Sequence, residues 1–375
     1  MSGLKILMLN HEFPPVGGGA SPVTLDLCRA LVRKNNRVDV VTMHFKGTPR
    51  FECIDGVNVY RTPAIRRRAD ISHTAELATY FPGALGKTLS LIAENRYDVI
   101  HCHFMVPGAP LGYVVSKLCR IPLIVTCHGT DVPAHNPDRF GLVHKIIGPA
   151  WRFLARRIPL ITSPSEYLKR SILQACAQAN VVVVPNGIAV DQFPPLPKTK
   201  HILMCSRLFA FKGVQHVIEA VKDLDCDWTL DIIGAGPYLS ELKAQARGAR
   251  VPIHFHGWLE KASSEFKRLY GESSLFVFPS LAENFPTVLL DAMTARMAII
   301  SSSAGGCPEV VGEAGLLVQP GDVAGFRDAI VRLIDSPSDR ARLAQAAFDR
   351  AAQFSWDHVS QTFLETYHKL LRVRA

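Results

Sequence analysis

The stretch FPSLAENFPTVLLDAMTARMAIISSSAGGCPEVV, residues Phe278–Val311, decides the fold of this chain. An apolar strand over 275–278 leads into a polar loop that carries Glu283, and a helix is predicted to begin near Thr287. A second apolar strand follows at 298–301. This order of strand, loop, helix and strand is typical of a parallel α/β sheet, in which the loops after the strands gather ligands.

Two carboxylates lie in this stretch, Glu283 in the loop and Asp291 about one turn into the predicted helix. Carboxylates accept hydrogen bonds from sugar hydroxyls, while a helix start offers N–H groups and a partial positive charge that suit a phosphate. The combination predicts a site for a nucleotide-sugar. The alternative is an ordinary buried helix with two solvated acids.

At these residues the sequence resembles the retaining nucleotide-sugar glycosyltransferases of family 4. The family pattern reads roughly P-S-x-x-E-G-F-G-x-x-x-x-E-A-M and then G-G-x-P-E. The matching residues here are Pro279-Ser280, Glu283, Phe285, Asp291-Ala292-Met293, Gly305-Gly306 and Pro308-Glu309. In the family the first Glu meets the donor sugar and the second binds the nucleotide ribose, so the resemblance implies these roles for Glu283 and Asp291.

The chain departs from the family pattern at three positions. Asp291 replaces the second Glu, and Asn284 and Pro286 flank Phe285 where glycines are usual. Because Pro286 has no N–H, a backbone contact there must move to a neighbour such as Thr287. Phe285, Pro286, Thr287 and Asp291 are our candidate substrate-binding residues in this stretch.

The resemblance spans nearly the whole chain and implies the GT-B fold. This is an α/β architecture of two doubly wound, Rossmann-like domains facing across a cleft, with a C-terminal helix that returns to the first domain. Alternating strands and helices on both sides of the Pro-rich run 194–197 indicate the same organisation. The predicted parts are an acceptor-side domain at 1–190, a linker at 191–200, a nucleotide-sugar-binding domain at 201–355 and the returning helix at 356–375.

Composition limits the class of protein. The chain has 375 residues, 48% of them hydrophobic and 20% charged, which suggests two folded domains and excludes a disordered chain. Its nine cysteines show no C-x-x-C spacing, so reduced thiols are expected and not a disulfide framework or zinc site. No apolar run approaches the ~18 residues of a membrane-spanning helix. We expect a cytoplasmic protein, soluble or peripheral on the inner membrane face.

A net charge of +9 favours an anionic partner, but no nucleic-acid-binding motif occurs. Segment 145–157 mixes cations with apolar residues, a pattern that suits an anionic membrane surface. It equally suits a packed helix whose arginines extend into solvent. Its members are Lys145, Arg152, Arg156 and Arg157 among Ile146, Ile147, Trp151, Phe153 and Leu154, and Arg66-Arg67-Arg68 forms a second basic cluster.

Three consecutive glycines, Gly17, Gly18 and Gly19, follow the first predicted strand. The dinucleotide fingerprint G-x-G-x-x-G is absent, which disfavours a nicotinamide enzyme. Family 4 enzymes carry a similar P-P-x-G-G stretch that faces the donor phosphates and the acceptor. The resemblance therefore makes these glycines candidates for substrate binding.

His128-Gly129-Thr130-Asp131 follows the apolar strand 121–127 and resembles the family motif H-G-x-D, whose His lies beside the donor sugar. The resemblance makes His128 a catalytic candidate, with His103 a weaker one. Asp131 either binds the acceptor or caps its own loop. His101, His103 and His128 could approach a metal ion, but no carboxylate or Cys spacing supports such a site. No D-x-D motif occurs, so no metal or other cofactor is required by the sequence.

Arg207 and Lys212 follow the first strand of the second domain and open its first helix. A guanidinium fork and an ammonium at a helix start make an anion site. Family enzymes place the R-L-x-x-x-K-G residues on the donor diphosphate, which implies that role here. Gly234, Gly236 and Gly257 fit family positions that line the nucleotide pocket.

Together these features imply transfer of a hexosyl unit from a UDP- or GDP-linked sugar to a hydroxyl acceptor, with retention of configuration. The acceptor is expected to be a glycan or lipid-linked saccharide in polysaccharide or glycolipid biosynthesis. The leaving diphosphate, neutralised by Arg207 and Lys212, helps to deprotonate the acceptor. Glu283 and His128 position the sugar. Two alternatives remain: a sugar-nucleotide epimerase or hydrolase of related fold, and a non-catalytic nucleotide-sugar-binding protein.

Overall fold

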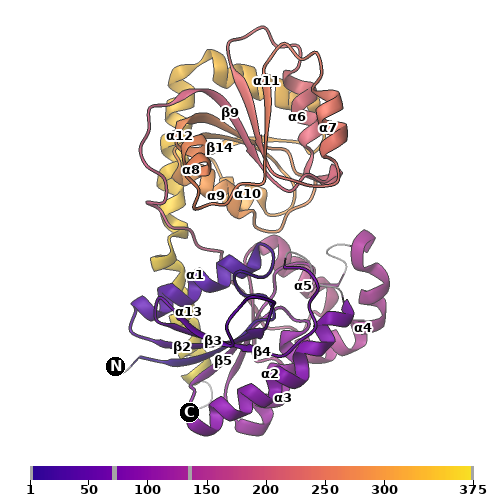
Figure 1. The fold of residues 1–375 in the computed structure, drawn as a ribbon, viewed down its shortest axis with the longest axis vertical. Helices are drawn as coiled ribbons and strands as arrows, with labels where there is room; N and C mark the ends of the chain where they lie inside the picture. Colours follow the sequence, from indigo (N-terminus) through magenta and orange to yellow (C-terminus); the bar gives the residue numbers. More distant parts are fainter. Residues whose placement is uncertain (1–2, 70–73, 134–136, 373–375) are drawn as a thin grey trace. The chain divides into compact units, whose positions relative to one another are not determined.

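The computed structural model describes residues 3–69, 74–133 and 137–372, with backbone alone at 74–75 and 137–145. The chain folds into two units (Figure 1). Unit 1 comprises Met1–Gly187 together with Trp356–Ala375, and unit 2 comprises Ile188–Ser355.

Unit 1 is built on an eight-stranded sheet with the order β3-β4-β2-β1-β5-β6-β7-β8. Every pairing in the described part is parallel except that of β3 with β4. The strands are β1 (Lys5–Leu9), β2 (Arg37–Met43), β3 (Phe51–Ile54), β4 (Val57–Thr62), β5 (Val99–His103), β6 (Leu123–Thr126), β7 (Leu160–Ser163) and β8 (Val181–Val183). The central strands β5 and β6 are buried along their whole length, as expected for apolar runs in a parallel sheet covered on both faces.

Helices cover both faces of this sheet. One face packs against α2 (Thr74–Glu94), α3 (Gly108–Cys119), α4 (Pro137–Arg157) and α5 (Glu166–Ala175). The other packs against α1 (Ala20–Arg33) and α13 (Trp356–Arg372), which lie side by side in Figure 1. The C-terminal helix α13 buries Val359, Phe363 and Tyr367 in unit 1, so its predicted return to the first domain is confirmed.

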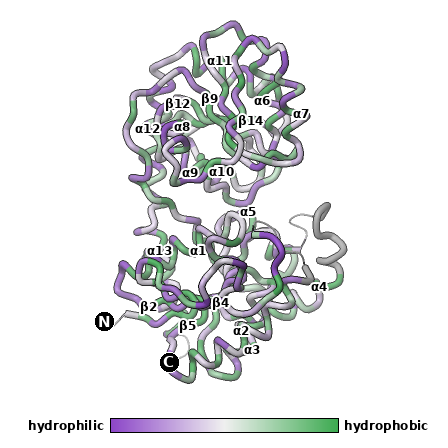
Figure 2. The backbone as a smooth tube through the Cα atoms, viewed as in Figure 1, coloured by the Kyte–Doolittle hydropathy of each residue, from purple (hydrophilic) through white to green (hydrophobic). Residues whose placement is uncertain are grey.

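Unit 2 contains a six-stranded parallel sheet with the order β11-β10-β9-β12-β13-β14. The strands are β9 (Thr199–Cys205), β10 (Thr229–Ile233), β11 (Ile253–Gly257), β12 (Ser273–Phe278), β13 (Ala298–Ser302) and β14 (Gly315–Val318). Hydrophobic segments gather around β9 and β12 in Figure 2. Two doubly wound α/β units confirm the predicted fold class.

The helices of unit 2 again lie on both faces. One core holds side chains of α6 (Val214–Val221), α7 (Leu239–Gln245) and α11 (Val323–Asp335). The opposite core holds side chains of α8 (Ser264–Glu272), α9 (Thr287–Thr294) and α10 (Cys307–Val311). Helix α12 (Pro337–Ala351) contributes to both, and the 3-10 turns are η1 (Ala210–Lys212) and η2 (Ala352–Phe354).

The predicted linker at 191–200 differs from the structure, because these residues pack on unit 2. The ring of Phe193 stacks on Tyr270 with centroids 4.9 Å apart. Lys198 Nζ donates hydrogen bonds to the carbonyls of Gly271 at 2.8 Å and Ala295 at 2.6 Å. The chain instead passes between the units at residues 187–188 and 355–356. Aromatic stacking and the lysine anchors outweigh the breaking effect of the prolines.

Candidate functional site

The candidate residues of unit 2 follow the carboxyl ends of neighbouring parallel strands. Arg207 and Lys212 follow β9, and Glu283 follows β12, which pairs with β9. Gly234 and Gly236 follow β10, on the other side of β9. A parallel sheet brings such loops to one edge. The structure therefore gathers at one edge residues that lie up to 76 positions apart in the sequence.

Lys212 and Glu283 form an ion pair in which the ammonium donates to the carboxylate. Their side chains are 13% and 12% exposed, so the pair is largely screened from solvent. Two backbone contacts hold the loops together beneath it. The Leu281 N–H donates to the Phe211 carbonyl at 2.8 Å. Gly213 has φ +74°, and a Cβ there would lie 2.2 Å from the Pro279 oxygen, which requires glycine.

The glycine turn after β13 supports Glu283 from a third strand. The Gly306 N–H donates to the Glu283 carbonyl at 3.2 Å. Gly305 has φ +55°, and a Cβ there would lie 1.9 Å from the same oxygen. The Glu283 side chain is thus held by the loop after β9 and its backbone by the turn after β13.

Gly234 and Gly236 have a packing role that the sequence did not reveal. Added Cβ atoms would lie 1.8 Å from the Ser206 oxygen and 2.2 Å from the Leu208 oxygen. These glycines therefore bring the loops after β9 and β10 together. Gly257 differs, because no described atom lies within 4 Å of an added Cβ and its φ of +70° alone favours glycine.

Asp291 is fully buried, and both of its carboxylate oxygens have donors from the protein. Gln192 Nε2 donates to Oδ1 at 3.0 Å, and Lys261 Nζ donates to Oδ2 at 2.5 Å. The sequence predicted neither partner, because both lie in segments far from the motif. Asp291 therefore anchors two loops of unit 2. This structural role is additional to the ribose contact that the resemblance implies for it.

Three candidate residues lie at or just before the start of helix α9, each in a different environment: Phe285, Pro286 and Thr287. The Phe285 ring lies in the core, edge-on to Phe354 with centroids 5.7 Å apart, so a substrate contact through this ring is not available. Pro286 is the N-cap residue of α9, and no side chain caps that end. Thr287 is the first helical residue. The predicted backbone contact at Thr287 stays a prediction.

In unit 1, His128 lies at the end of a row of histidines. Its ring stacks on His103, with His103 Nδ1 and His128 Nε2 2.9 Å apart, and His103 stacks on His101. Burial lowers the pKa of His128 and lowers that of His103 well below its ordinary value. The pKa of His101 falls to about 3, chiefly by burial. The lowered pKa values favour the neutral form of all three rings. The contact between His103 Nδ1 and His128 Nε2 orients the His128 ring.

Asp131 caps its own loop. Its Oδ1 accepts the N–H groups of His128 at 2.9 Å and Gly129 at 3.0 Å, and its Oδ2 accepts that of Met105 at 2.6 Å. The side chain is nearly buried. These three bonds favour the capping alternative over the predicted acceptor binding, because they direct both oxygens at the backbone.

The glycine loop of unit 1 divides into a structural and an open part. Gly17 has φ +116°, and an added Cβ would lie 2.7 Å from the Glu12 side chain. The Gly18 N–H donates to Glu12 Oε2 at 3.1 Å, yet added Cβ atoms at Gly18 and Gly19 would meet no described atom within 4 Å. Arg66 supports the loop, because its buried guanidinium lies 3.6 Å from Glu12. Gly18 and Gly19 leave a surface that a ligand can approach closely.

Comparison with known proteins decides the family. A family model described as Glycosyltransferase Family 4 matches residues 17–192, and one described as Glycosyl transferases group 1 matches residues 199–336. The chain belongs to glycosyltransferase family 4. The resemblance found in the sequence is thereby confirmed, and the protein is a glycosyltransferase enzyme.

Relatives of this family 4 glycosyltransferase cover nearly its whole length. An uncharacterised glycosyltransferase of Methanocaldococcus jannaschii is 27% identical over 395 aligned positions, which cover 97% of this chain and 98% of the relative. A glycogen synthase of Mycobacterium tuberculosis is 27% identical and covers 97% of this chain and 94% of its own.

Solved structures share the fold of the glycosyltransferase at low identity. Sucrose-phosphate synthase from Thermosynechococcus elongatus aligns with a TM-score of 0.81 at 20% identity, covering 99% of this chain and 100% of that one. Anabaena HepE in complex with UDP-glucose aligns with a TM-score of 0.75 at 21% identity, covering 98% of this chain and 100% of that one.

The segment 145–157 of the glycosyltransferase has one packed and one exposed face. Trp151 and Leu154 are buried in unit 1, whereas Ile146 and Phe153 are exposed. The Arg157 guanidinium lies 3.8 Å from the centre of the Phe153 ring. The predicted member Lys145 has its side chain outside the described residues. No helix within the described ranges is both long and apolar enough to cross a bilayer.

Among the described residues of the glycosyltransferase, one group of three side chains is arranged to hold a metal ion: Asp231, His254 and His256. The site residues predicted from the sequence include none of these three, although His256 directly precedes the candidate Gly257. The signal was present as the H-x-H spacing at 254–256, which places both rings on one face of a strand. The carboxylate on the preceding strand becomes visible only with the register of the sheet.

Proposed function

We propose that this glycosyltransferase moves a hexosyl unit from a nucleoside-diphosphate sugar to a hydroxyl acceptor with retention of configuration. The observation that carries the proposal is the ion pair of Lys212 and Glu283 at the edge of the unit 2 sheet, with Arg207 on the same loop. A donor carries both matching parts, since its diphosphate suits the ammonium and its sugar hydroxyls suit the carboxylate. The complex of HepE with UDP-glucose supports a donor of this type.

The donor separates the pair when it binds. Lys212 turns to a diphosphate oxygen, and Glu283 then accepts hydrogen bonds from the sugar. Helix α6 begins at Val214 without a side-chain cap, which suits the same diphosphate. Each new contact replaces part of the attraction that the two charges lose, so both groups stay compensated in a largely buried place.

In the proposed reaction the bond between the anomeric carbon and the diphosphate oxygen breaks, and the acceptor oxygen bonds to the same face of that carbon. The acceptor proton passes to the leaving phosphate oxygen, so atoms and charge balance. Negative charge grows on the diphosphate as the sugar becomes oxocarbenium-like. Arg207 and Lys212 stabilise this charge, which is the type of effect that dominates such rates.

We further propose that the chemistry needs no metal ion, because Arg207 and Lys212 neutralise the negative charge of the diphosphate that a metal ion would otherwise neutralise. Turnover that persists in excess EDTA is the expected result. Abolished turnover that returns with Mg²⁺ or Mn²⁺ would contradict this part of the proposal.

The test is release of UDP or GDP from sugar donors by the purified protein with and without hydroxyl acceptors. A transferase releases nucleotide in proportion to added acceptor, and NMR of the product gives an unchanged anomeric configuration. Nucleotide release that does not depend on the acceptor indicates a hydrolase. A changed sugar without release indicates an epimerase. Stabilisation by a nucleotide without any turnover indicates a binding protein.

We propose a lipid-linked saccharide as the acceptor on one observation, the exposed face of α4. There Arg152, Arg156 and Arg157 lie with the exposed apolar side chains Ile146 and Phe153. Cations beside apolar groups suit the headgroup region of an anionic bilayer. The protein would then work at the cytoplasmic membrane face, in polysaccharide or glycolipid synthesis.

A further inference from the structure

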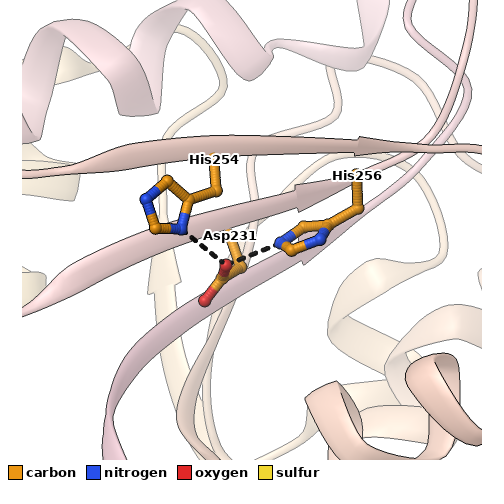
Figure 3. Close-up of side chains that lie close together, drawn as sticks. All are labelled: Asp231, His254 and His256. Atoms are coloured by element: carbon orange, nitrogen blue, oxygen red, sulfur yellow. Dashed lines mark hydrogen bonds and ion pairs between the residues drawn. The ribbon is translucent and has the colours of Figure 1, made fainter.

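Three histidines surround one buried carboxylate in unit 2, at the edge of the sheet formed by β10 and β11. Asp231 is 2% exposed at its side chain. His256 Nε2 lies 2.7 Å and His254 Nδ1 3.6 Å from its Oδ1. Figure 3 shows both rings beside the carboxylate. His201 Nδ1 lies 2.5 Å from its Oδ2. Every partner that the described residues give Asp231 is a histidine.

The register of the strands fixes this convergence. Asp231 of β10 is paired directly with His254 of β11. His256 is two residues further along β11, where the register with β10 shifts between Ile232 and Ile233. Its ring still lies beside Asp231, as that of His254 does (Figure 3).

The carboxylate has no strong positive partner. Burying an ionised carboxylate is costly unless a charge compensates it. Lysine or arginine supplies that charge for other buried acids here, as Lys261 does for Asp291. Asp231 ion-pairs with no lysine or arginine in the described part of the chain.

We propose that Asp231 Oδ1, His254 Nδ1 and His256 Nε2 bind a divalent transition-metal ion of the zinc type. Zinc–ligand bonds of about 2.0–2.2 Å in a tetrahedral site separate neighbouring ligand atoms by about 3.3 Å. The two oxygen–nitrogen distances fall on either side of that value, and all three atoms lie within 4.8 Å of one another. Small side-chain rotations complete the geometry. Two nitrogens and one oxygen favour zinc-like ions over Mg²⁺ or Ca²⁺.

Outer partners support the same assignment. Glu265 lies 3.4 Å from His256 Nδ1, so a proton on that nitrogen leaves Nε2 as the ligand. His201 donates to the second oxygen of Asp231 and leaves Oδ1 for the ion. His254 is 59% exposed at its side chain, which gives an entry path and room for a water as fourth ligand.

The ion joins β10 to β11, and none of its three ligands is a residue that we assign to the proposed sugar transfer. Because the three ligands come together only in the folded sheet, binding stabilises the native state. The expected role is structural, as a clamp on the edge strand.

The test is calorimetric titration of chelator-treated, full-length protein with ZnCl₂. One ion per chain is expected to bind through this site, with a higher melting temperature. His254→Gln and His256→Gln should each weaken this binding at least tenfold. Asp231→Asn, which keeps the shape and removes the charge, should do the same. His358→Gln, an exposed histidine of α13 in unit 1, is the matched control and should bind as the wild type does.

Co²⁺ substitution gives a second readout, because a tetrahedral site shows intense visible absorption that the His254→Gln variant should lose. Exposure of His254 makes that variant the one expected to fold, and circular dichroism verifies it. The proposal is overturned if the wild type binds no zinc, or if binding is unchanged in folded His254→Gln and His256→Gln. In that case the histidines only donate hydrogen bonds to Asp231.

Discussion

The ammonium of Lys212 is held against the carboxylate of Glu283 by loops from two neighbouring strands, β9 and β12. In the proposed mechanism the two charges serve the two ends of a nucleotide-sugar, and each compensates the other before the donor binds. The proposed catalytic role of the pair and its structural role can be separated by measurement.

Lys212→Met is expected to lower kcat by on the order of 10²–10³, because it removes a positive group aimed at charge that grows on the leaving diphosphate. It should also lower stability, since Glu283 is left buried and unpaired. The double variant Lys212→Met/Glu283→Gln should regain stability without regaining activity. Lys222→Met, which removes a partly exposed lysine that pairs with Glu219 in the same unit, is the control. Wild-type kcat in Lys212→Met would remove this residue from the mechanism.

Asp291→Ala is expected to raise the donor KM more than it lowers kcat, because a ribose contact exists in the ground and transition states alike. Glu283→Ala should instead lower kcat. Lys261→Met serves as the comparison, since it disturbs the anchoring of Asp291 without removing the carboxylate. If Asp291→Ala leaves the donor KM unchanged, the aspartate only anchors Gln192 and Lys261, and the ribose assignment is wrong.

Gly17→Ala and Gly18→Ala are expected to differ in kind. The first should lower the melting temperature, because Gly17 has φ +116° and its Cβ would collide with Glu12. The methyl group added by Gly18→Ala meets no described atom within 4 Å, so the melting temperature should stay within about a degree of the wild-type value. The substrate KM should rise. Paired thermal and kinetic measurements check this. Unchanged kinetics in Gly18→Ala would show that no ligand approaches this loop.

Stability is expected to fall as the pH drops from about 6.5 to 4. Burial lowers the pKa of His11 from 6.5 to about 4, against the raising effect of Glu12. The unfolded chain therefore binds a proton in this window that the native state does not, and the free energy of unfolding declines as the pH decreases. His11→Phe should flatten the slope by up to about 1.4 kcal/mol per pH unit. Urea unfolding at several pH values measures the slope of the unfolding free energy against pH, and His358→Gln is the control. An unchanged slope in His11→Phe would contradict the prediction.

Replacing Arg152, Arg156 and Arg157 with Gln is expected to reduce co-sedimentation with anionic vesicles, because each cation near the surface contributes roughly 1 kcal/mol. A triple variant of exposed cations in unit 2 has the same change of charge and should sediment as the wild type does. Its positions are Lys243, Arg247 and Arg250. If both variants sediment equally, segment 145–157 is not a membrane-binding surface. The argument for a lipid-linked acceptor is then lost as well.

Much of this molecule was predictable from short-range patterns. The apolar runs of β6 and β12 and the motif around Glu283 predicted parallel strands and the loops that carry the candidate site residues. What the sequence hid depends on register and on contacts between distant segments. Lys261 meets Asp291 from a loop 30 residues away. The prolines at 194–197 indicated a linker, yet the neighbouring Phe193 fixes this segment to unit 2.

The return of α13 to unit 1 makes that unit discontinuous in the sequence. Residues 188–355 form unit 2 as one continuous segment, which lies between the two parts of unit 1. Unit 1 needs both of its parts, because Phe363 and Tyr367 of α13 fill its core. Tyr367 Oη also lies 2.7 Å from His101 Nδ1, in the row that ends at His128. The histidine row of unit 1 therefore depends on a side chain that unit 2 separates in sequence from the rest of the row, so the row is complete only when α13 is packed in place.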